Sequence, residues 1–259
     1  MSYNLKDGQY NSNSAQQRKS SLANVVKGQD PDIVCLQELG TATDFSHFKA
    51  DAFASECNNR SYGSYQEGTT AVMWDSAIYT KQTGGVIDCT VADGGDGYTR
   101  KCTWVKLERN ADGAVFYVIS AHFDLNKPND SAQTLIDYVA SNFTDAPVIV
   151  AGDFNANEQS WVNTRRFTNS GYTNANTEYT DFLAANDIRG YSPYSWDERV
   201  PYPTAAENDL TPTFSKHGTI IDWCYYIGSG INSGSFAVVT GAGTAPSDHY
   251  PIYMKFTFC

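Results

Sequence analysis

VIVAGDFNAN, residues 148–157, is an apolar run that ends in a carboxylate and a carboxamide. Its first five residues are apolar or small, which is typical of a strand covered on both faces. Asp153 and Asn155 follow, separated by one aromatic residue. Burying a polar group without a partner costs several kcal/mol, about 2–7 for a neutral amide and more for a charge. We therefore expect these two side chains to have polar partners at the end of this strand.

Apolar runs of this kind recur along the chain and predict a protein rich in β-strands. The aromatic residues support this, because 17 Tyr, 13 Phe and 5 Trp favour strands. The strands that we expect cover residues 1–5, 32–38, 69–74, 85–91, 103–108, 115–123, 147–154, 219–228, 235–239 and 250–258. Helical periodicity is rarer and predicts helices over residues 14–28, 44–57, 130–143 and 177–186, the third beginning with a capping box formed by Asp130 and Gln133.

The number of expected strands relative to the number of expected helices indicates how the sheets are covered. Several strands are continuous apolar runs and should be buried on both faces, but the helices are too few to cover both faces of one large sheet. Two sheets packed face to face, with helices outside, satisfy both observations and predict an α/β sandwich of several layers. No linker, repeat or low-complexity tract divides residues 1–259, so we expect a single domain.

The charge of the chain limits the kinds of partner that it can have. The chain carries 29 acidic and 18 basic residues, a formal net charge of −11. Nucleic-acid affinity comes largely from Lys and Arg side chains that neutralise phosphates, so this balance excludes a passive, basic DNA-binding module. Catalysis on phosphate esters stays open if divalent cations mediate the contact with the substrate.

The six cysteines are not arranged as a zinc site, because none forms a CxxC pair or stands at zinc spacing from a histidine. Cys89 and Cys102 lie on two runs that could form a hairpin, and we expect one or more disulfides. The alternative is buried free thiols, above all for Cys35 and Cys224, which lie inside apolar strands.

Three Asn-X-Ser/Thr sequons, at Asn59, Asn129 and Asn142, agree with the even number of cysteines in indicating an exported glycoprotein. The apolar runs are too short to cross a bilayer, so no transmembrane segment is expected. Residues 1–5 look like the middle of a strand, so we expect a secreted protein whose signal peptide is absent from this sequence.

Acidic, amide and imidazole side chains also stand at the ends of other apolar strands. We expect them to meet at one edge of the sandwich, where they can share hydrogen bonds, water and a cation. Each has an ordinary alternative, since an Asp after a strand is often a turn former or a helix cap, and a histidine can be a satisfied core residue. The polar residues at strand ends are Asn4, Glu38, His122, Asp153, Asn155, Asp222, Asp248 and His249.

The order in which the motifs carrying these residues follow one another along the chain resembles that of a known family. The set "YNL", "LQE", "SAHFD", "GDFNAN", "IDW" and "SDHYPI" resembles the endonuclease/exonuclease/phosphatase superfamily, with its deoxyribonuclease I-like fold. The resemblance runs from Asn4 to the last strand, and "GDFN" and "SDH" are its most specific parts. It implies a four-layer α/β sandwich of two mainly antiparallel sheets flanked by helices. It also implies hydrolysis of phosphoesters with Mg²⁺, or with Mn²⁺ or Ca²⁺ in its place.

For the metal, Glu38 resembles the principal Mg²⁺ ligand of the family, and Asn4 lies beside it. Hard cations prefer oxygen ligands and can retain water, so one or two carboxylates and a substrate phosphate suffice. Asp248 resembles a further acidic residue near the metal. Glu67, which precedes a strand, is placed like an active-site acid in parts of the family; the alternative is a solvated loop charge.

For catalysis, Asp153 and Asn155 resemble the pair that orients or deprotonates the attacking water. His249 resembles the histidine that contacts the phosphate, Asp222 the carboxylate that holds its imidazole in one tautomer, and His122 the second histidine of the site. A phosphodiester is anionic, so a cation would neutralise it while an imidazolium stabilises charge on the equatorial oxygens. Asp222 beside His249 would raise the pKa of the imidazole.

The resemblance implies a chemistry but not a substrate. Arg100, Lys101 and Arg165 are candidate phosphate-binding residues, and they favour a secreted, monomeric nuclease that acts on DNA. One alternative is a phosphoesterase for a small or lipid phosphoester, such as sphingomyelin or an inositol phosphate. Another is a non-catalytic binding module on the same scaffold, which would predict an eroded site, whereas the motif residues are all present.

Overall fold

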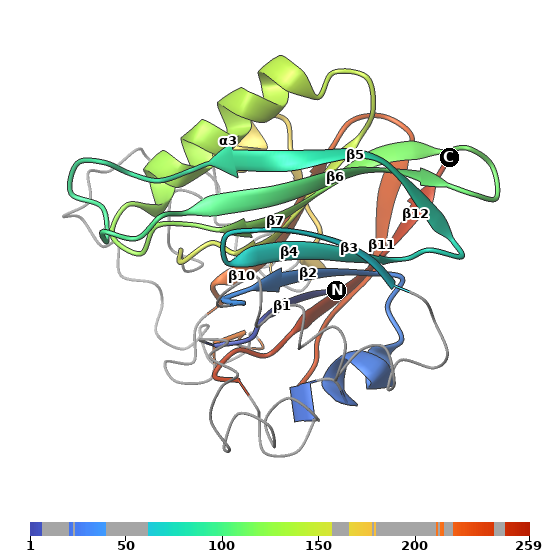
Figure 1. Ribbon diagram of the computed structural model, residues 1–259, viewed down its shortest axis with the longest axis horizontal. Coiled ribbons are helices and arrows are strands. Elements are labelled where there is room, and N and C mark those ends of the chain that lie inside the picture. Colours follow the sequence, from blue (N-terminus) through green and yellow to red (C-terminus); the bar gives the residue numbers. More distant parts are fainter. Residues whose placement is uncertain are drawn as a thin grey trace.

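The computed structural model describes residues 1–6, 21–22, 24–39, 62–156, 166–177, 179, 211, 213–214, 220–240 and 247–259. Two β-sheets of six strands each make up most of this part of the chain (Figure 1). Several predictions fall outside the described residues: the helix 44–57, most of the helix 177–186, the candidate phosphate-binding residue Arg165, and Cys57 and Asn59.

The strands of the first sheet are β1 (Ser2–Asn4), β2 (Ile33–Gln37), β3 (Tyr62–Glu67), β4 (Thr70–Asp75), β11 (Ile231–Val238) and β12 (Ile252–Phe258). Those of the second sheet are β5 (Tyr79–Asp88), β6 (Lys101–Arg109), β7 (Val115–His122), β8 (Val148–Asp153), β9 (Thr173–Asn174) and β10 (Asp222–Ile227). The helical elements are α3 (Pro128–Asn142), the short α4 (Phe167–Asn169) and a segment at residues 24–29.

The spatial order of the strands is β11-β12-β1-β2-β4-β3 in the first sheet and β5-β6-β7-β8-β10-β9 in the second. Neighbouring strands are antiparallel except for two parallel pairs, β1 with β2 and β7 with β8. Both sheets are thus mainly antiparallel, as predicted. Strands β3 and β9 were not indicated by the sequence patterns.

Helices cover the outer faces of both sheets (Figure 1). Helix α3 packs Leu135 into a core on the outer face of the second sheet, and residues 24–29 contribute to a core on the outer face of the first. Alternate residues of each strand serve the two faces of a sheet: Val34 packs on the helix side, whereas Cys35 packs in the core between the sheets. This confirms the predicted four-layer sandwich.

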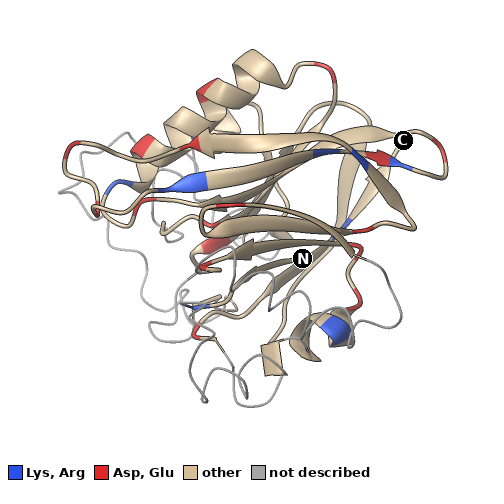
Figure 2. Ribbon diagram, in the orientation of Figure 1, with Lys and Arg blue, Asp and Glu red and all other residues tan. Residues whose placement is uncertain are grey.

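Charged residues are sparse along the strands of the two sheets, as Figure 2 shows. Basic residues mark both ends of β6, which begins at Lys101 and ends at Arg109. The loop from β5 enters at the Lys101 end and carries two acids, Asp93 and Asp96, and one base, Arg100.

Helix α3 begins two residues earlier than predicted. Lys127 is its N-cap without a side-chain hydrogen bond, and Pro128 opens the first turn, where a missing N–H costs nothing. The predicted capping box of Asp130 and Gln133 is therefore wrong. Instead, the buried Asp124 accepts the backbone N–H of Lys127 at 2.8 Å. No helix in the described ranges is long and apolar enough to cross a membrane.

The cysteines within the described residues are free thiols. Cys89 and Cys102 lie where β5 ends and β6 begins, with their Sγ atoms 3.6 Å apart. The disulfide expected from the hairpin pattern is not formed in the structure and stays a prediction. Cys35 and Cys224 are buried between the two sheets, and burial raises the pKa of the Cys35 thiol to about 12, so this thiol is an inert core group.

A buried polar seam joins the two sheets. Gln37 of β2 donates from Nε2 to Ser120 Oγ of β7 at 2.9 Å and to Ser2 Oγ of β1 at 3.2 Å. All three side chains are fully buried, so these hydrogen bonds are needed to offset the loss of hydration. The seam fixes β2 against β7 one residue before Glu38 and two residues before His122.

Strands β7 and β8 approach closely at Gly152. A Cβ atom on Gly152 would lie 1.9 Å from the carbonyl oxygen of Ala121, its neighbour in register. No side chain fits there without moving one of the two backbones. Strand packing therefore accounts for the glycine that precedes Asp153 in "GDFN".

Replacing Gly152 by Ala should destabilise the fold by at least about 1–3 kcal/mol, because the added methyl group collides with the Ala121 backbone. The midpoint of urea unfolding measures this loss. Gly28→Ala is the matched control: it lies in the helical segment with nothing within 4 Å of an added Cβ, so it should keep or raise the midpoint. Equal midpoints for Gly152→Ala and the parent would contradict the close approach of β7 and β8.

Candidate active site

One edge of the sandwich collects polar side chains from both sheets. In the second sheet, His122, Asp153 and Asp222 are neighbours in register on β7, β8 and β10, so their side chains point to the same face. The first sheet supplies Asn4 at the end of β1 and Glu38 directly after β2. The predicted convergence thus has a simple structural origin in strands that end together.

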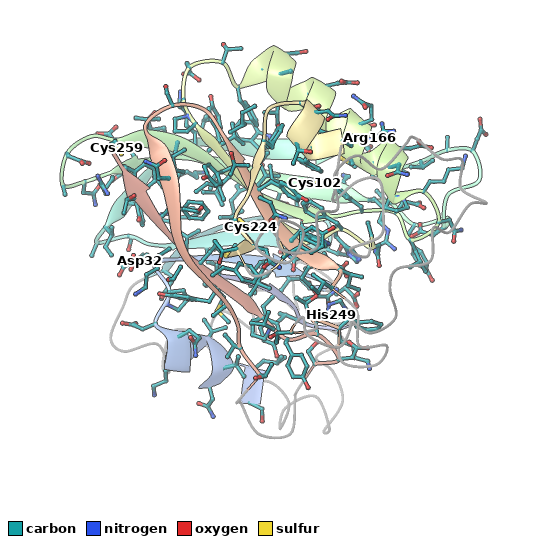
Figure 3. The ribbon with its side chains drawn as sticks, turned by 180° about the vertical axis from the view of Figure 1, so that it is seen from behind. Asp32, Cys102, Arg166, Cys224, His249 and Cys259 are labelled. Atoms are coloured by element: carbon teal, nitrogen blue, oxygen red, sulfur yellow. The ribbon has the colours of Figure 1, made fainter. Side chains whose placement is uncertain are left out.

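His249 reaches this edge from the segment before β12. Its backbone forms an antiparallel bridge with Phe214, and the two rings pack with their centroids 4.9 Å apart. Figure 3 shows His249 at one end of the sandwich, far from Asp32 and Cys259 at the other end.

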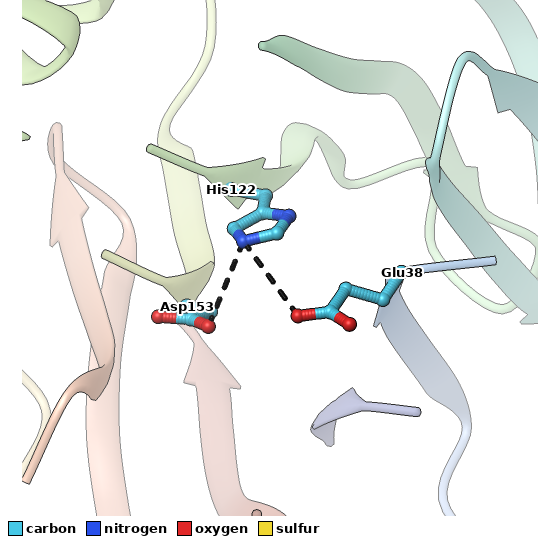
Figure 4. Close-up of side chains that lie close together, drawn as sticks. All are labelled: Glu38, His122 and Asp153. Carbon is cyan, nitrogen blue, oxygen red and sulfur yellow. Dashed lines mark ion pairs between the residues drawn. The ribbon is translucent and has the colours of Figure 1, made fainter. Parts of the chain in front are cut away.

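Asp153 is the centre of the cluster. Its Oδ2 atom accepts a hydrogen bond from Asn4 Nδ2 at 2.9 Å and lies 3.7 Å from Nε2 of both His122 and His249. Figure 4 shows Asp153 with His122 and Glu38. The Oε1 atom of Glu38 lies 4.0 Å from Nε2 of His122. Asp153 is 2% exposed, and burial raises the pKa of its carboxyl although both histidines act in the opposite direction. The acid that ends β8 therefore has partners from both sheets.

Asn4 joins the two carboxylates. Its Nδ2 atom donates to Glu38 Oε1 and to Asp153 Oδ2, both at 2.9 Å, while its Oδ1 atom accepts the backbone N–H of Lys6. In this orientation the amide oxygen is turned toward Lys6 and the NH₂ group toward the acids, and the ligand role of Asn4 stays a prediction. The fully buried amide sets the spacing between a carboxylate of each sheet.

Left-handed backbone marks this edge. Four non-glycine residues of the described part have positive φ, and three of them are Lys6 (50°), Glu38 (58°) and Asn155 (48°). Such conformations cost about 1–3 kcal/mol each and persist where the surrounding structure holds them. Asn155 is held by its N–H, which donates to Asp153 Oδ1, and by Nδ2, which donates to the Phe123 carbonyl, both at 2.8 Å.

His249 is held as an imidazolium by Asp222. Its Nδ1 atom lies 2.8 Å from Asp222 Oδ2, and both side chains are almost fully buried. Burial alone would lower the pKa, but the charge and hydrogen bond of Asp222, with negative charge from Asp153 and Asp248, raise the pKa of His249 to about 10. In this state both ring nitrogens are donors, one toward Asp222 and one into the cluster.

His122 is the electrostatic opposite of His249. Burial lowers the pKa of His122 to about 4, and the positive charges of Arg100 and His249 act in the same direction. The neutral ring can accept a hydrogen bond, and Arg100 Nη1 lies 2.8 Å from its Nε2 atom. Asp96 holds the guanidinium by a salt bridge and by a 3.0 Å hydrogen bond from Nε. At neutral pH the cluster therefore contains one charged and one neutral imidazole.

The converging donors fit a hard divalent cation. Two groups have ligand atoms that all lie within 4.8 Å of one another: Glu38, His122 and Asp153 form one, and Asp153, Asp222 and His249 form the other. The first group is better suited, because Asp222 and His249 already bond each other. Glu38 and Asp153 offer carboxylate oxygens, and the Glu38 side chain is 31% exposed, so water and phosphate can complete the coordination.

Three predicted site residues are engaged outside this cluster. Asp248 forms an ion pair with Lys6 at 2.8 Å, and Glu67 forms one with Lys101 at 3.4 Å. Neither acid belongs to the two groups of converging ligands found in the described residues. Arg100, by contrast, lies against His122 at the cluster itself.

Asp96 and Ser247 belong to the site but were not singled out from the sequence. Ser247 Oγ donates to the Asn4 carbonyl at 2.8 Å and accepts the N–H of His249 at 3.2 Å, so it ties the "SDH" segment to β1. In the sequence, Ser247 could have been recognised as a site residue because it is the first residue of the "SDH" motif. Asp96 stands four residues before Arg100, and opposite charges so close in a short loop indicate a pair.

Comparisons with known proteins point to one family. The model of the Endonuclease/Exonuclease/phosphatase family matches residues 1–249. No curated protein sequence matches the chain. Among solved structures, a functionally unknown conserved protein from Enterococcus faecalis V583 has a TM-score of 0.68 at 16% identity, with 100% of this chain and 98% of that chain covered.

Two further solved structures carry names that state an activity or a ligand. A mannosyl-6-phosphatase from Bacteroides thetaiotaomicron VPI-5482 has a TM-score of 0.66 at 16% identity, covering 99% of this chain and 98% of that chain. TDP2 from D. rerio, complexed with a single-strand DNA product, has a TM-score of 0.61 at 17% identity, covering 99% and 97%. At these identities the likeness shows a shared fold.

In the metal-free protein, the two histidines should titrate on opposite sides of neutrality, because their pKa values are about 4 for His122 and about 10 for His249. Nitrogen-15 NMR of the imidazole rings checks this, with His122→Gln and His249→Gln assigning the signals. Two rings that both titrate near pH 6.5 would contradict the arrangement.

The same pKa shift predicts how stability depends on pH. The folded-state pKa of His249 lies above its ordinary value of 6.5, so its contribution to stability is full below about pH 6.5 and is lost as the pH rises toward 10. Asp222→Asn should weaken this dependence, because it removes the largest of the interactions that raise the pKa of His249. Unfolding midpoints measured between pH 6 and pH 10 for both proteins test the difference, and identical profiles would contradict it.

Proposed function

The chain belongs to the endonuclease/exonuclease/phosphatase family, and we propose that it is a divalent-metal-dependent phosphodiesterase, a nuclease that cleaves DNA by direct attack of water. The family hydrolyses phosphoester bonds, and the chain has its fold. One observation carries the proposal: an amide, an imidazolium and a neutral imidazole all lie within 3.7 Å of Asp153 Oδ2, with Glu38 beside them.

Glu38 and Asp153 would hold the cation. A divalent ion bound there supplies positive charge that neutralises the phosphate and favours ionisation of water. Mg²⁺ suits these oxygen donors, with Mn²⁺ or Ca²⁺ as substitutes. Asn4 donates to both acids, so the two carboxylates are held together before the ion binds.

The other side chains have roles that follow from their charge. Asp153 would orient the attacking water and accept its proton, because its carboxylate lies at the centre of the cluster. His249, held by Asp222, would donate to a non-bridging phosphate oxygen and stabilise the charge that develops there. Arg100 would bind the phosphate beside the neutral ring of His122.

The charge balance at the site favours a diester over a monoester. A phosphodiester carries one negative charge, whereas a phosphomonoester at neutral pH carries nearly two. Arg100 and His249 are the described cations that lie against the cluster, and each already faces an acid, Asp96 and Asp222. Lys6 and Lys101 are likewise paired, with Asp248 and Glu67. A mannosyl-6-phosphatase and a protein complexed with DNA share this fold, so both substrate classes belong in the assay.

We propose also that the protein is secreted, glycosylated and monomeric. The exposed Asn142 in a sequon and the 3.6 Å approach of Cys89 and Cys102 support export. A loss of mass on treatment with an N-glycosidase, measured on protein collected from the native source, tests this. Unmodified protein confined to cell extracts would contradict it.

His249→Ala and Asp153→Ala should each lower kcat/KM on DNA by at least about 10²–10³-fold, because each removes a group that acts on the transition state. Glu38→Gln should raise the Mg²⁺ concentration that gives half-maximal rate. EDTA should abolish the activity of the parent. Asp112→Asn, which alters an exposed pair with Arg109 in a turn, is the matched control and should keep full activity.

The substrate panel consists of plasmid DNA, RNA, sphingomyelin, inositol phosphates and mannose 6-phosphate, each with Mg²⁺ and with EDTA. Faster turnover of DNA than of every other substrate supports the nuclease. Preference for a monoester or for sphingomyelin would replace it by one of the alternative phosphoesterases. Full activity of His249→Ala would contradict the assignment of this cluster as the active site.

A further inference from the structure

One carboxylate holds the loop that carries Arg100 against a second loop. Asp96 accepts the backbone N–H of Tyr98 at Oδ1 and that of Leu125 at Oδ2, both at 3.0 Å, and forms a salt bridge with Arg100. Tyr98 and Leu125 therefore have neighbouring backbones, both bonded to one carboxylate. They are 70% and 61% exposed, and no other large hydrophobic residue in the described ranges is so exposed.

Arg100 connects this exposed pair with the proposed phosphate site. Its guanidinium carbon lies 5.6 Å from the centroid of the Tyr98 ring, and its Nη1 atom lies 2.8 Å from His122 Nε2. The phenol ring and the imidazole thus both lie close to one guanidinium. A phosphate bound by Arg100 would have the Tyr98 ring beside one of its ester groups.

The backbone under the exposed pair is firmly held. The buried Asp124 accepts the N–H of Asp96 at 2.9 Å and those of Asn126 and Lys127 at 2.8 Å, so it joins the two loops a second time. A Cβ atom on Gly95 would lie 2.5 Å from a backbone carbonyl, so the loop turns where only glycine fits. Side chains presented on such a fixed backbone lose little backbone entropy when a ligand covers them.

We propose that Tyr98 and Leu125 form a subsite for the nucleobase next to the scissile phosphate. The inference rests on the proposed nuclease activity. A base has a flat π face that can stack on the Tyr98 ring while its edge covers Leu125, and Arg100 takes the phosphate. Stacking of this kind tolerates any sequence, because every base has a π face.

The test uses a short single-stranded DNA with one cleavable phosphodiester and its abasic counterpart, in which the two flanking nucleotides lack bases. Tyr98→Ala should raise KM about tenfold on the strand with bases and change kcat by less than about twofold. Leu125→Ala should act in the same direction with a smaller effect. Tyr98→Phe keeps the ring and should match the parent. On the abasic strand, all four proteins should have the same KM.

Each other outcome has a distinct meaning. If Tyr98→Ala changes KM equally on both strands, or on neither, the base subsite is overturned while the nuclease proposal stands. If the parent cleaves neither strand but hydrolyses a monoester or a lipid, the nuclease proposal is overturned and the base subsite falls with it. Thermal unfolding of Tyr98→Ala should match the parent, because the ring is exposed, and this separates a lost contact from a lost fold.

Discussion

Two hydrogen bonds from one amide hold the halves of the site together. Asn4 donates to Glu38 of its own sheet and to Asp153 of the other. It therefore fixes the distance between the two carboxylates, which apolar packing of the two sheets alone would not set. Two carboxylates this close repel each other, and a neutral NH₂ group with two donors can bond both without adding charge. Deeper in the sandwich, the hydrogen bond between Gln37 and Ser120 also joins the two sheets, because it fixes the strands that lead to Glu38 and His122. The chemistry at the edge thus depends on polar contacts between two apolar layers.

The two histidines show how neighbours decide charge in one buried environment. Both rings lie 3.7 Å from the same oxygen of Asp153, and both are almost fully buried. Burial acts to lower the pKa of both rings. For His249 it is outweighed by a second carboxylate, Asp222, which is bonded to the other ring nitrogen. His122 instead faces the Arg100 guanidinium, which lowers its pKa further. The result is a fixed cation and a neutral ring beside the same oxygen of one acid. Pairs of groups driven apart in pKa are what acid and base roles require.

Local patterns predicted the layers and the edge where the polar residues meet, because a buried strand that ends in a carboxylate needs partners there. They did not reveal features whose deciding contact is distant or whose sequence pattern is weak. The orientation of Asn4 depends on Asp153, 149 positions away, and on a backbone N–H two residues on. Strand β3, "YGSYQE", is a half-buried edge strand without an apolar alternation to reveal it. The capping-box pattern of α3 was overruled by Pro128, which starts the helix earlier.

The acidity of the chain and its proposed anionic substrate are compatible because the negative charges near the site are of two kinds. Four acids each face a cation: Asp96 with Arg100, Asp222 with His249, Asp248 with Lys6 and Glu67 with Lys101. Glu38 and Asp153 differ, since the neutral Asn4 amide joins them and Asp153 shares the His249 imidazolium with Asp222. Their charge is suited to attract a divalent ion. A bound divalent ion would neutralise these two charges and so favour the phosphate. Under this arrangement a net charge of −11 does not have to be overcome by a basic groove, because the acids that attract the metal also prepare the site for the anion.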